Sequence, residues 1–142
     1  MTSRKLINFV VPGDDPPQIQ GSSQLERLKP YGNVVLYTDR PNNIKEQMRR
    51  VRNAHIILNT RGIVKWYRNT LQKLPNLRMI ATCSIGTDMI DLPAASEQGI
   101  VVSNQPGKTA PMVAEHIIGL MFAVSKRAGF QTSELKAGRW ST

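Results

Sequence analysis

The amino-acid sequence predicts an α/β fold: a parallel five-stranded sheet with helices on both faces. Short apolar runs alternate along the chain with stretches of helical spacing, as in repeated strand–helix–strand units. Runs such as 34–36 and 56–58 are continuously apolar, which is typical of strands buried on both faces. The chain has 142 residues, 40% of them hydrophobic, so it can form the packed core of one domain.

Five strands and five helices are expected in alternation. Asn43 suits the N-cap of the second helix, and Gly99 suits the end of the fourth. Trp66, Thr70 and Leu74 fall on one helical stripe and support the third. The strands are expected at 6–11, 34–37, 55–58, 78–83 and 100–102, and the helices at 22–28, 43–51, 64–74, 91–98 and 110–126.

The last helix divides the chain into two parts, with the boundary expected after Pro106. Residues 110–126 are apolar on most sides, and a helix of that kind must be buried all round. It could lie across the sheet as a final layer, or belong to a second domain or a partner subunit. Because residues 127–142 are polar and short, the second interpretation is favoured.

Composition excludes several classes of protein. Cys83 is the single cysteine, which rules out an intrachain disulfide and fits a reducing, cytoplasmic compartment. With His55 and His116 it offers no metal-ligand spacing, so no metal site is expected. The first apolar run ends at Gly13 and the run near residues 110–124 is too short to span a bilayer, so neither a signal peptide nor a membrane partner is expected.

The chain is basic, with a net charge of +9. Such a charge permits binding to nucleic acid but does not demonstrate it. The basic cluster Lys45, Arg49, Arg50 and Arg52 is expected to cover the solvent side of one helix, without interleaved aromatic residues. A nucleic-acid partner is therefore not expected.

The segment 83–88, with the sequence CSIGTD, follows the fourth strand and is the first candidate site. Ligands of open parallel sheets bind beyond the carboxyl ends of the strands. Gly86 permits a tight turn whose successive N–H groups form a concavity for a carboxylate or phosphate. The alternative is an ordinary turn in which Asp88 or Asp91 caps the next helix. Arg61, after the third strand, could contact the same anion or simply be solvated.

A nucleotide-binding loop is not expected in this chain. Gly107-Lys108-Thr109 matches the end of a phosphate-binding loop, but Val102 stands where that pattern needs glycine, and Pro106 removes a backbone donor. Thr109 is instead expected to cap the following helix. No two glycines are separated by a single residue, so the G-x-G-x-x-G dinucleotide fingerprint does not occur in these 142 residues.

From Leu74 onward the chain resembles the D-isomer-specific 2-hydroxyacid dehydrogenase family, which includes phosphoglycerate dehydrogenase. The resemblance is carried in order by the segments SIGTDMID, GIVVSNQPG and VAEHIIG, followed by LKAGRW. It implies a flavodoxin-like substrate domain at 1–106. It also implies that residues 107–142 form a linker helix and the start of a Rossmann domain that binds NAD.

The resemblance also implies site residues. Ser84 stands where many family members have glycine, and Gly62 stands where phosphoglycerate-type members have serine. No position of this sequence matches the family's catalytic arginine, glutamate or histidine, so no catalytic residue is assigned. The implied substrate contacts are Arg61, Ser84, Ile85, Gly86 and Asn104, and the implied cofactor contacts are Ile85, Thr109 and Val113.

These observations predict the substrate-binding domain of an NAD-dependent D-2-hydroxyacid dehydrogenase, inactive as this chain alone. Its expected ligand is a small 2-hydroxy or 2-keto acid. Its expected partner is a missing Rossmann domain or a second copy, in a dimer formed through the helix at 110–126. The alternative is a non-catalytic carboxylate-binding or protein-interaction module from a truncated or split gene.

Overall fold

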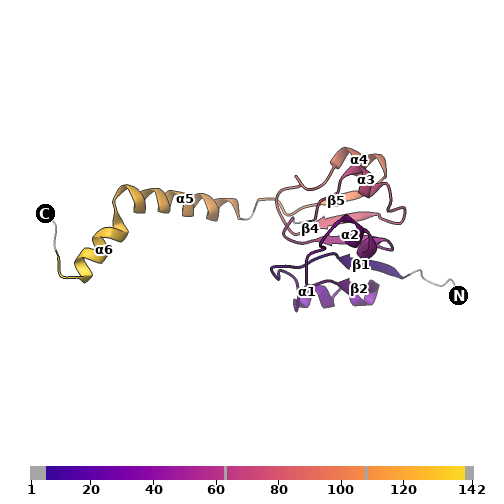
Figure 1. The fold of residues 1–142 in the computed structure, drawn as a ribbon, viewed down its shortest axis with the longest axis horizontal. Coiled ribbons are helices and arrows are strands. Elements are labelled where there is room, and N and C mark those ends of the chain that lie inside the picture. Colours follow the sequence, from indigo (N-terminus) through magenta and orange to yellow (C-terminus); the bar gives the residue numbers. More distant parts are fainter. Residues whose placement is uncertain (1–5, 63, 108, 140–142) are drawn as a thin grey trace. The chain divides into compact units, whose positions relative to one another are not determined.

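The computed structural model describes residues 6–62, 64–107 and 109–139. Contacts within the chain divide it into two units, Met1–Pro106 and Gly107–Thr142. The first unit contains the sheet and the second contains two helices (Figure 1). The assignment of these units to a substrate domain and a linker stays a prediction.

The sheet of the first unit has five parallel strands, as predicted. They are β1 (Ile7–Val11), β2 (Gly32–Leu36), β3 (Ile56–Asn59), β4 (Met79–Thr82) and β5 (Val101–Ser103). The spatial order is β2-β1-β3-β4-β5, so the direction of winding reverses between β1 and β3. In this type of sheet, ligands bind beyond the carboxyl ends of the strands near such a reversal.

One face of the sheet packs against three helices. These are α2 (Ile44–Val51), α3 (Arg68–Leu71) and α4 (Leu92–Glu97). The strand residues Val10, Ile57 and Ile80 lie in register across β1, β3 and β4, and all three belong to the buried core. Burial of each such side chain stabilises the fold by about 1.5–3 kcal/mol. This core fixes the strand ends from which the loops of the site emerge.

Two helices begin at the residues that the sequence indicates. The Oδ1 atom of Asn43 accepts a hydrogen bond from the Glu46 N–H at 2.9 Å, which confirms it as the N-cap of α2. The Oδ1 atom of Asp91 accepts from the Ala94 N–H at 2.9 Å at the start of α4. Each cap of this kind contributes about 1 kcal/mol.

The prediction of a long helix at 64–74 is wrong. Only Arg68–Leu71 is helical, and the preceding backbone forms a bridge to a distant loop. The Trp66 N–H donates to the Met89 carbonyl at 2.7 Å, and the Asp91 N–H donates to the Trp66 carbonyl at 2.9 Å. This pairing satisfies the backbone while it buries the Trp66 side chain completely, so the apolar spacing reflects burial and not a helix.

The helix predicted at 22–28 is shorter than expected. Helix α1 (Ser23–Glu26) is followed by the 3₁₀ turn η1 (Lys29–Tyr31). Pro30 lies within that turn, and proline cannot continue an α-helix because it lacks the N–H donor.

The second unit consists of α5 (Ala110–Ser125) and α6 (Ala128–Lys136). Helix α6 was not predicted, because its sequence has no apolar stripe. Arg127 joins the two helices in the left-handed conformation, with φ of 51°. None of the residues of α5 is buried, and its large apolar side chains are about half exposed or more. None of the described helices is both long and apolar enough to cross a membrane.

Candidate functional site

The candidate site lies at the carboxyl edge of the sheet. Because all five strands are parallel, the loops after β1, β3, β4 and β5 emerge at this one edge. Side-chain hydrogen bonds join these loops to one another. The predicted substrate residues Arg61, Ser84, Ile85, Gly86 and Asn104 all belong to these loops.

Asp14 organises the loop after β1. Its fully buried carboxylate accepts hydrogen bonds from the N–H groups of Gln18 at 3.0 Å, Ile19 at 3.0 Å and Gln20 at 2.8 Å. Burial alone would raise the pKa of Asp14, but these three donors, together with the Thr60 hydroxyl, outweigh it and hold the pKa below its usual value. The loop is therefore held in one conformation from within.

Gln18 links this loop to the two loops that follow β3 and β4. Its Oε1 atom accepts a hydrogen bond from the Arg61 N–H at 3.0 Å. Its Nε2 atom donates to the Cys83 carbonyl at 3.1 Å. Both ends of the side-chain amide are thus engaged, on loops 43 and 65 residues away in sequence.

Arg61 is exposed and lies in a strained turn. Its φ of 56° is followed by a φ of 60° at Gly62. The left-handed conformation costs a non-glycine residue about 1–2 kcal/mol, and strain of this kind is often found at functional sites. The guanidinium lies 3.4 Å from the carbonyl oxygens of Pro16 and Pro17, which is long for a hydrogen bond. Within the described ranges no carboxylate pairs with it, so its charge is available to a ligand.

In the turn 84–86 the carbonyl groups are all hydrogen-bonded within the described part of the protein, whereas the N–H groups are not. The carbonyl of Ser84 accepts from the Gln105 N–H at 3.0 Å. The carbonyl of Ile85 accepts from Asn104 Nδ2 at 2.7 Å, and that of Gly86 accepts from Ser84 Oγ at 2.9 Å. The N–H groups of residues 84, 85 and 86 donate to no acceptor in the part of the chain that the structure describes.

The occupied carbonyls also orient the free N–H groups. In a planar trans peptide, the carbonyl of one residue and the N–H of the next point in opposite directions. Gln18, Gln105 and Asn104 hold the carbonyls of Cys83, Ser84 and Ile85, and so they fix the N–H groups of residues 84, 85 and 86. Anion-binding backbone turns present successive N–H donors of this kind, which makes the turn 84–86 the candidate site.

Two acidic or nucleophilic groups border the turn. A Cβ atom added to Gly86 would lie 2.8 Å from Asp88 Oδ2, so one carboxylate sits directly beside the turn. Cys83 is partly buried, and burial, together with the charge of Asp14, raises the pKa of its thiol. The thiol therefore stays protonated near pH 7 and is not set up as a nucleophile.

The predicted cofactor contacts fall in both units. Ile85 is exposed on the turn, while Thr109 and Val113 belong to the second unit at the start of α5. Thr109 occupies the N-cap position, but its side chain makes no capping hydrogen bond, because its backbone is helical (φ −93°, ψ −14°) and not extended. Its neighbour Lys108 lies outside the described residues.

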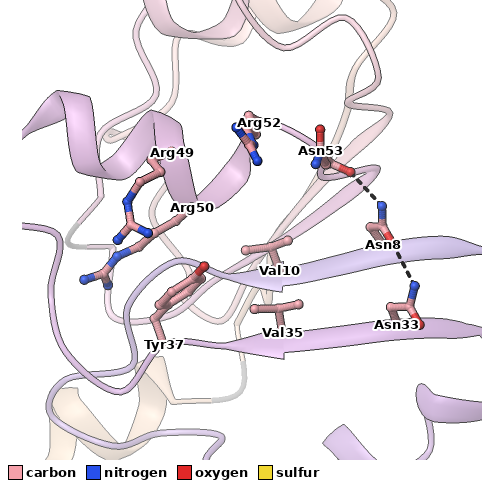
Figure 2. A pocket seen from close by; sticks show the side chains of 9 residues that line it. All are labelled: Asn8, Val10, Asn33, Val35, Tyr37, Arg49, Arg50, Arg52 and Asn53. Atoms are coloured by element: carbon pink, nitrogen blue, oxygen red, sulfur yellow. Dashed lines mark hydrogen bonds between the residues drawn. The ribbon is translucent and has the colours of Figure 1, made fainter.

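A hollow separate from this candidate site lies on the face of the sheet beside α2, with a volume of about 550 Å³ (Figure 2). Here the prediction that Arg50 faces solvent is wrong. Arg50 is buried, stacks on the ring of Tyr37 at 4.6 Å, and pairs with Asp39 and Glu46 at 2.6 Å each. Its charge is neutralised inside the protein. The hollow is lined by Asn8, Val10, Asn33, Val35, Tyr37, Arg49, Arg50, Arg52 and Asn53.

Comparison with known proteins places the chain in a family. The family model for the D-isomer specific 2-hydroxyacid dehydrogenase catalytic domain matches residues 17–140. The chain therefore belongs to this family, and the resemblance read from the sequence is confirmed.

Individual relatives agree with this assignment. A putative 2-hydroxyacid dehydrogenase of Haemophilus influenzae is 38% identical over 98 residues, which cover 68% of this chain and 30% of that protein. A hydroxypyruvate reductase of Thermotoga maritima is 40% identical over 84 residues, covering 59% of this chain and 28% of that protein. The chain thus spans under a third of the length of these two curated relatives.

A solved structure confirms the fold. The D-lactate dehydrogenase of Aquifex aeolicus, solved with NAD and lactic acid, superposes with a TM-score of 0.71 at 26% identity. The superposition covers 96% of this chain and 38% of that one. The predicted α/β fold with a parallel five-stranded sheet is therefore confirmed.

The residues of this chain do not fit a complete NAD site. A dinucleotide pyrophosphate is held by a glycine-rich turn that leads from a strand directly into a helix. Here α5 is preceded by Pro106 and begins with Pro111 in its first turn, and neither residue can supply a backbone N–H. The sequence contains no G-x-G-x-x-G segment.

Proposed function

We propose that residues 1–106 form the substrate-binding part of an NAD-dependent D-2-hydroxyacid dehydrogenase. In this proposal, the turn 84–86 and Arg61 hold the carboxylate of a small 2-hydroxy or 2-keto acid. The single observation that carries it is the set of three oriented, unengaged N–H groups on the turn. The names of the relatives support the substrate class, since one is a hydroxypyruvate reductase.

The proposed division of labour follows from the chemistry of the site. An N–H turn and a guanidinium bind and orient a carboxylate, leaving the neighbouring C2 atom directed toward solvent or a second domain. Conversion between a hydroxy and a keto group also needs a hydride carrier and an acid/base group within hydrogen-bond reach. His55 precedes β3, at the end of the strand opposite the site, and so cannot serve there.

We accordingly propose that this chain binds the acid but does not turn it over without further residues that hold NAD. The purified chain mixed with NADH and a panel of 2-keto acids is expected to leave the NADH absorbance unchanged. Steady NADH oxidation that scales with the amount of chain would contradict this part of the proposal.

Binding itself is tested by NMR titration of the isotope-labelled chain with oxamate, an unreactive analogue of a 2-keto acid. The amide signals of residues 84–86 are expected to shift in a saturable manner. Arg61→Gln should weaken the binding, whereas Arg52→Gln, at the hollow on the sheet face, should leave it unchanged. Saturable shifts confined to that hollow, or no saturable shifts, would refute the proposal.

A second proposal concerns α5, which we propose forms a contact with another protein surface. Met112, Ile117 and Phe122 are each at least half exposed, and apolar side chains gathered on one helix are typical of an interface. The surface would belong to a dinucleotide-binding domain or to a second copy of this chain in a dimer. Light scattering that shows only monomer at high concentration would contradict the dimer.

A further inference from the structure

The proposed anion site has two halves that are not bonded to each other. Arg61 lies after β3 and the turn 84–86 lies after β4. In the described part of the chain, no hydrogen bond joins residues 61–62 directly to residues 83–86. The pairing of β3 with β4 ends at the hydrogen bond from the Cys83 N–H to the Asn59 carbonyl at 3.0 Å, so beyond that point the relative placement of the two loops depends on other contacts.

Gln18 provides two such contacts. It accepts from the Arg61 N–H at 3.0 Å and donates to the Cys83 carbonyl at 3.1 Å, so a single side-chain amide spans both halves. Glutamine can do this because its amide group carries an acceptor and a donor at opposite ends. Alanine at this position would remove both of these hydrogen bonds while leaving the β3–β4 pairing in place.

The backbone that carries Gln18 is itself anchored. The Gln18 N–H donates to Asp14 Oδ1 at 3.0 Å, and the Asp14 N–H donates to the Tyr37 carbonyl at 2.9 Å. Asp14 is fully buried. The backbone of Gln18 is therefore held in place, and the two hydrogen bonds of its side chain restrain the Arg61 N–H and the Cys83 carbonyl relative to it.

Each bond acts on one half of the site. The bond to Arg61 supports the left-handed turn from which the guanidinium extends. The bond to the Cys83 carbonyl fixes the peptide that carries the Ser84 N–H, because carbonyl and amide of one peptide share a plane. Asn104 plays the corresponding part for the Gly86 N–H from the other side of the turn.

We propose that Gln18 is a positioning residue, which sets the spacing between Arg61 and the turn 84–86 so that both engage one carboxylate. This inference rests on the proposed function. Gln18 is not a catalytic residue, since it acts through the groups that touch the ligand. The proposal adds a site determinant from the loop after β1, a loop that the resemblance did not implicate.

The test compares oxamate affinity among variants by NMR titration. Gln18→Ala is expected to weaken binding about 5-fold, as befits the loss of two solvent-accessible hydrogen bonds. Gln18→Glu keeps the acceptor for the Arg61 N–H, but it loses the donor to Cys83 and adds a negative charge beside the site, so it should bind oxamate no better than Gln18→Ala. Gln20→Ala is the matched control, because it removes the same side chain two residues away, where no side-chain hydrogen bond is made within the described residues.

A second readout separates positioning from a general loss of structure. In Gln18→Ala, hydrogen exchange should accelerate at the Arg61 amide, while exchange at core amides such as Ile57 stays as in the unaltered chain. Faster exchange throughout the core together with weaker binding would mean a merely structural role and would overturn the inference.

The affinities separate this inference from the proposed function. If the unaltered chain binds oxamate at the turn 84–86 and Gln18→Ala binds equally well, the positioning role is wrong and the proposed function stands. If the unaltered chain binds no oxamate there, the proposed function fails and the positioning role fails with it.

Discussion

Replacing Arg61 by glycine should make the fold more stable and the site weaker at the same time. Arg61 has a φ of 56°, a conformation that costs a non-glycine residue about 1–2 kcal/mol. Glycine adopts it freely but loses about 0.5–1 kcal/mol more backbone entropy on folding. The side chain contributes little stability to offset this, because its two contacts are long and exposed. We expect Arg61→Gly to raise the free energy of unfolding by about 0.5 kcal/mol.

Binding should change in the opposite direction. A charge-assisted hydrogen bond to a carboxylate is worth about 1.5–3 kcal/mol, so loss of the guanidinium should weaken oxamate binding about 10-fold or more. Arg61→Lys is the matched control, since it keeps the strain and the charge but not the planar pair of donors. It should leave stability unchanged and weaken binding less than glycine does.

The two quantities are measured by urea denaturation, followed by tryptophan fluorescence, and by NMR titration with oxamate. Trp66 is fully buried and reports unfolding of the first unit. Arg61→Gly that binds oxamate as tightly as the unaltered chain would refute the role of the guanidinium. A loss of more than about 1 kcal/mol in stability would refute the reasoning about strain.

Three further perturbations have defined outcomes. The pKa of Asp14 is lowered in the folded state, so its contribution to stability is present above the unfolded pKa and is lost as the pH falls through the folded value. In acid titrations by circular dichroism, Asp14→Asn should therefore be less stable than the unaltered chain at pH 7, and the difference should shrink below about pH 3.8; a constant difference would contradict this. Asp88→Asn removes the negative charge beside Gly86 and should tighten oxamate binding about 3-fold in low salt, an effect that salt should reduce; unchanged affinity would contradict the placement of the ligand. Trp66→Ala should lower the free energy of unfolding by about 3–5 kcal/mol in urea titrations, and a loss below about 1 kcal/mol would contradict its place in the core.

Much of the fold could be predicted because its signals are local. Strands such as Ile56–Asn59 are short apolar runs, and Asn43 caps α2 through a contact with Glu46 three residues on. The error at 64–74 has a physical cause. Trp66 lies in a backbone bridge with Ile90, a residue from a distant segment, and its side chain is buried there without being helical. Its spacing from Thr70 and Leu74 therefore matches that of a helix although the three residues do not share one. Helix α6 was missed because a helix without buried residues has no apolar stripe to reveal it.

The candidate site could be predicted only in part for a similar reason. Gly86 and Arg61 stand out because each follows a strand, and parallel strands bring their carboxyl ends to one edge. Gln18 carries no such signal. Its role depends on partners 43 and 65 residues away, whose proximity arises only when β1, β3 and β4 are assembled. The burial of Arg50 was also not predicted. Its ion pair with Glu46 is local, but its contacts with Tyr37 and Asp39 depend on residues outside its own helix.

A crystal structure of this chain with bound oxamate tests the central claim most directly. We expect the oxamate carboxylate within hydrogen-bond distance of the N–H groups of residues 84–86 and of the Arg61 guanidinium. Oxamate bound at another surface, with those N–H groups facing only water at saturating concentration, would contradict it.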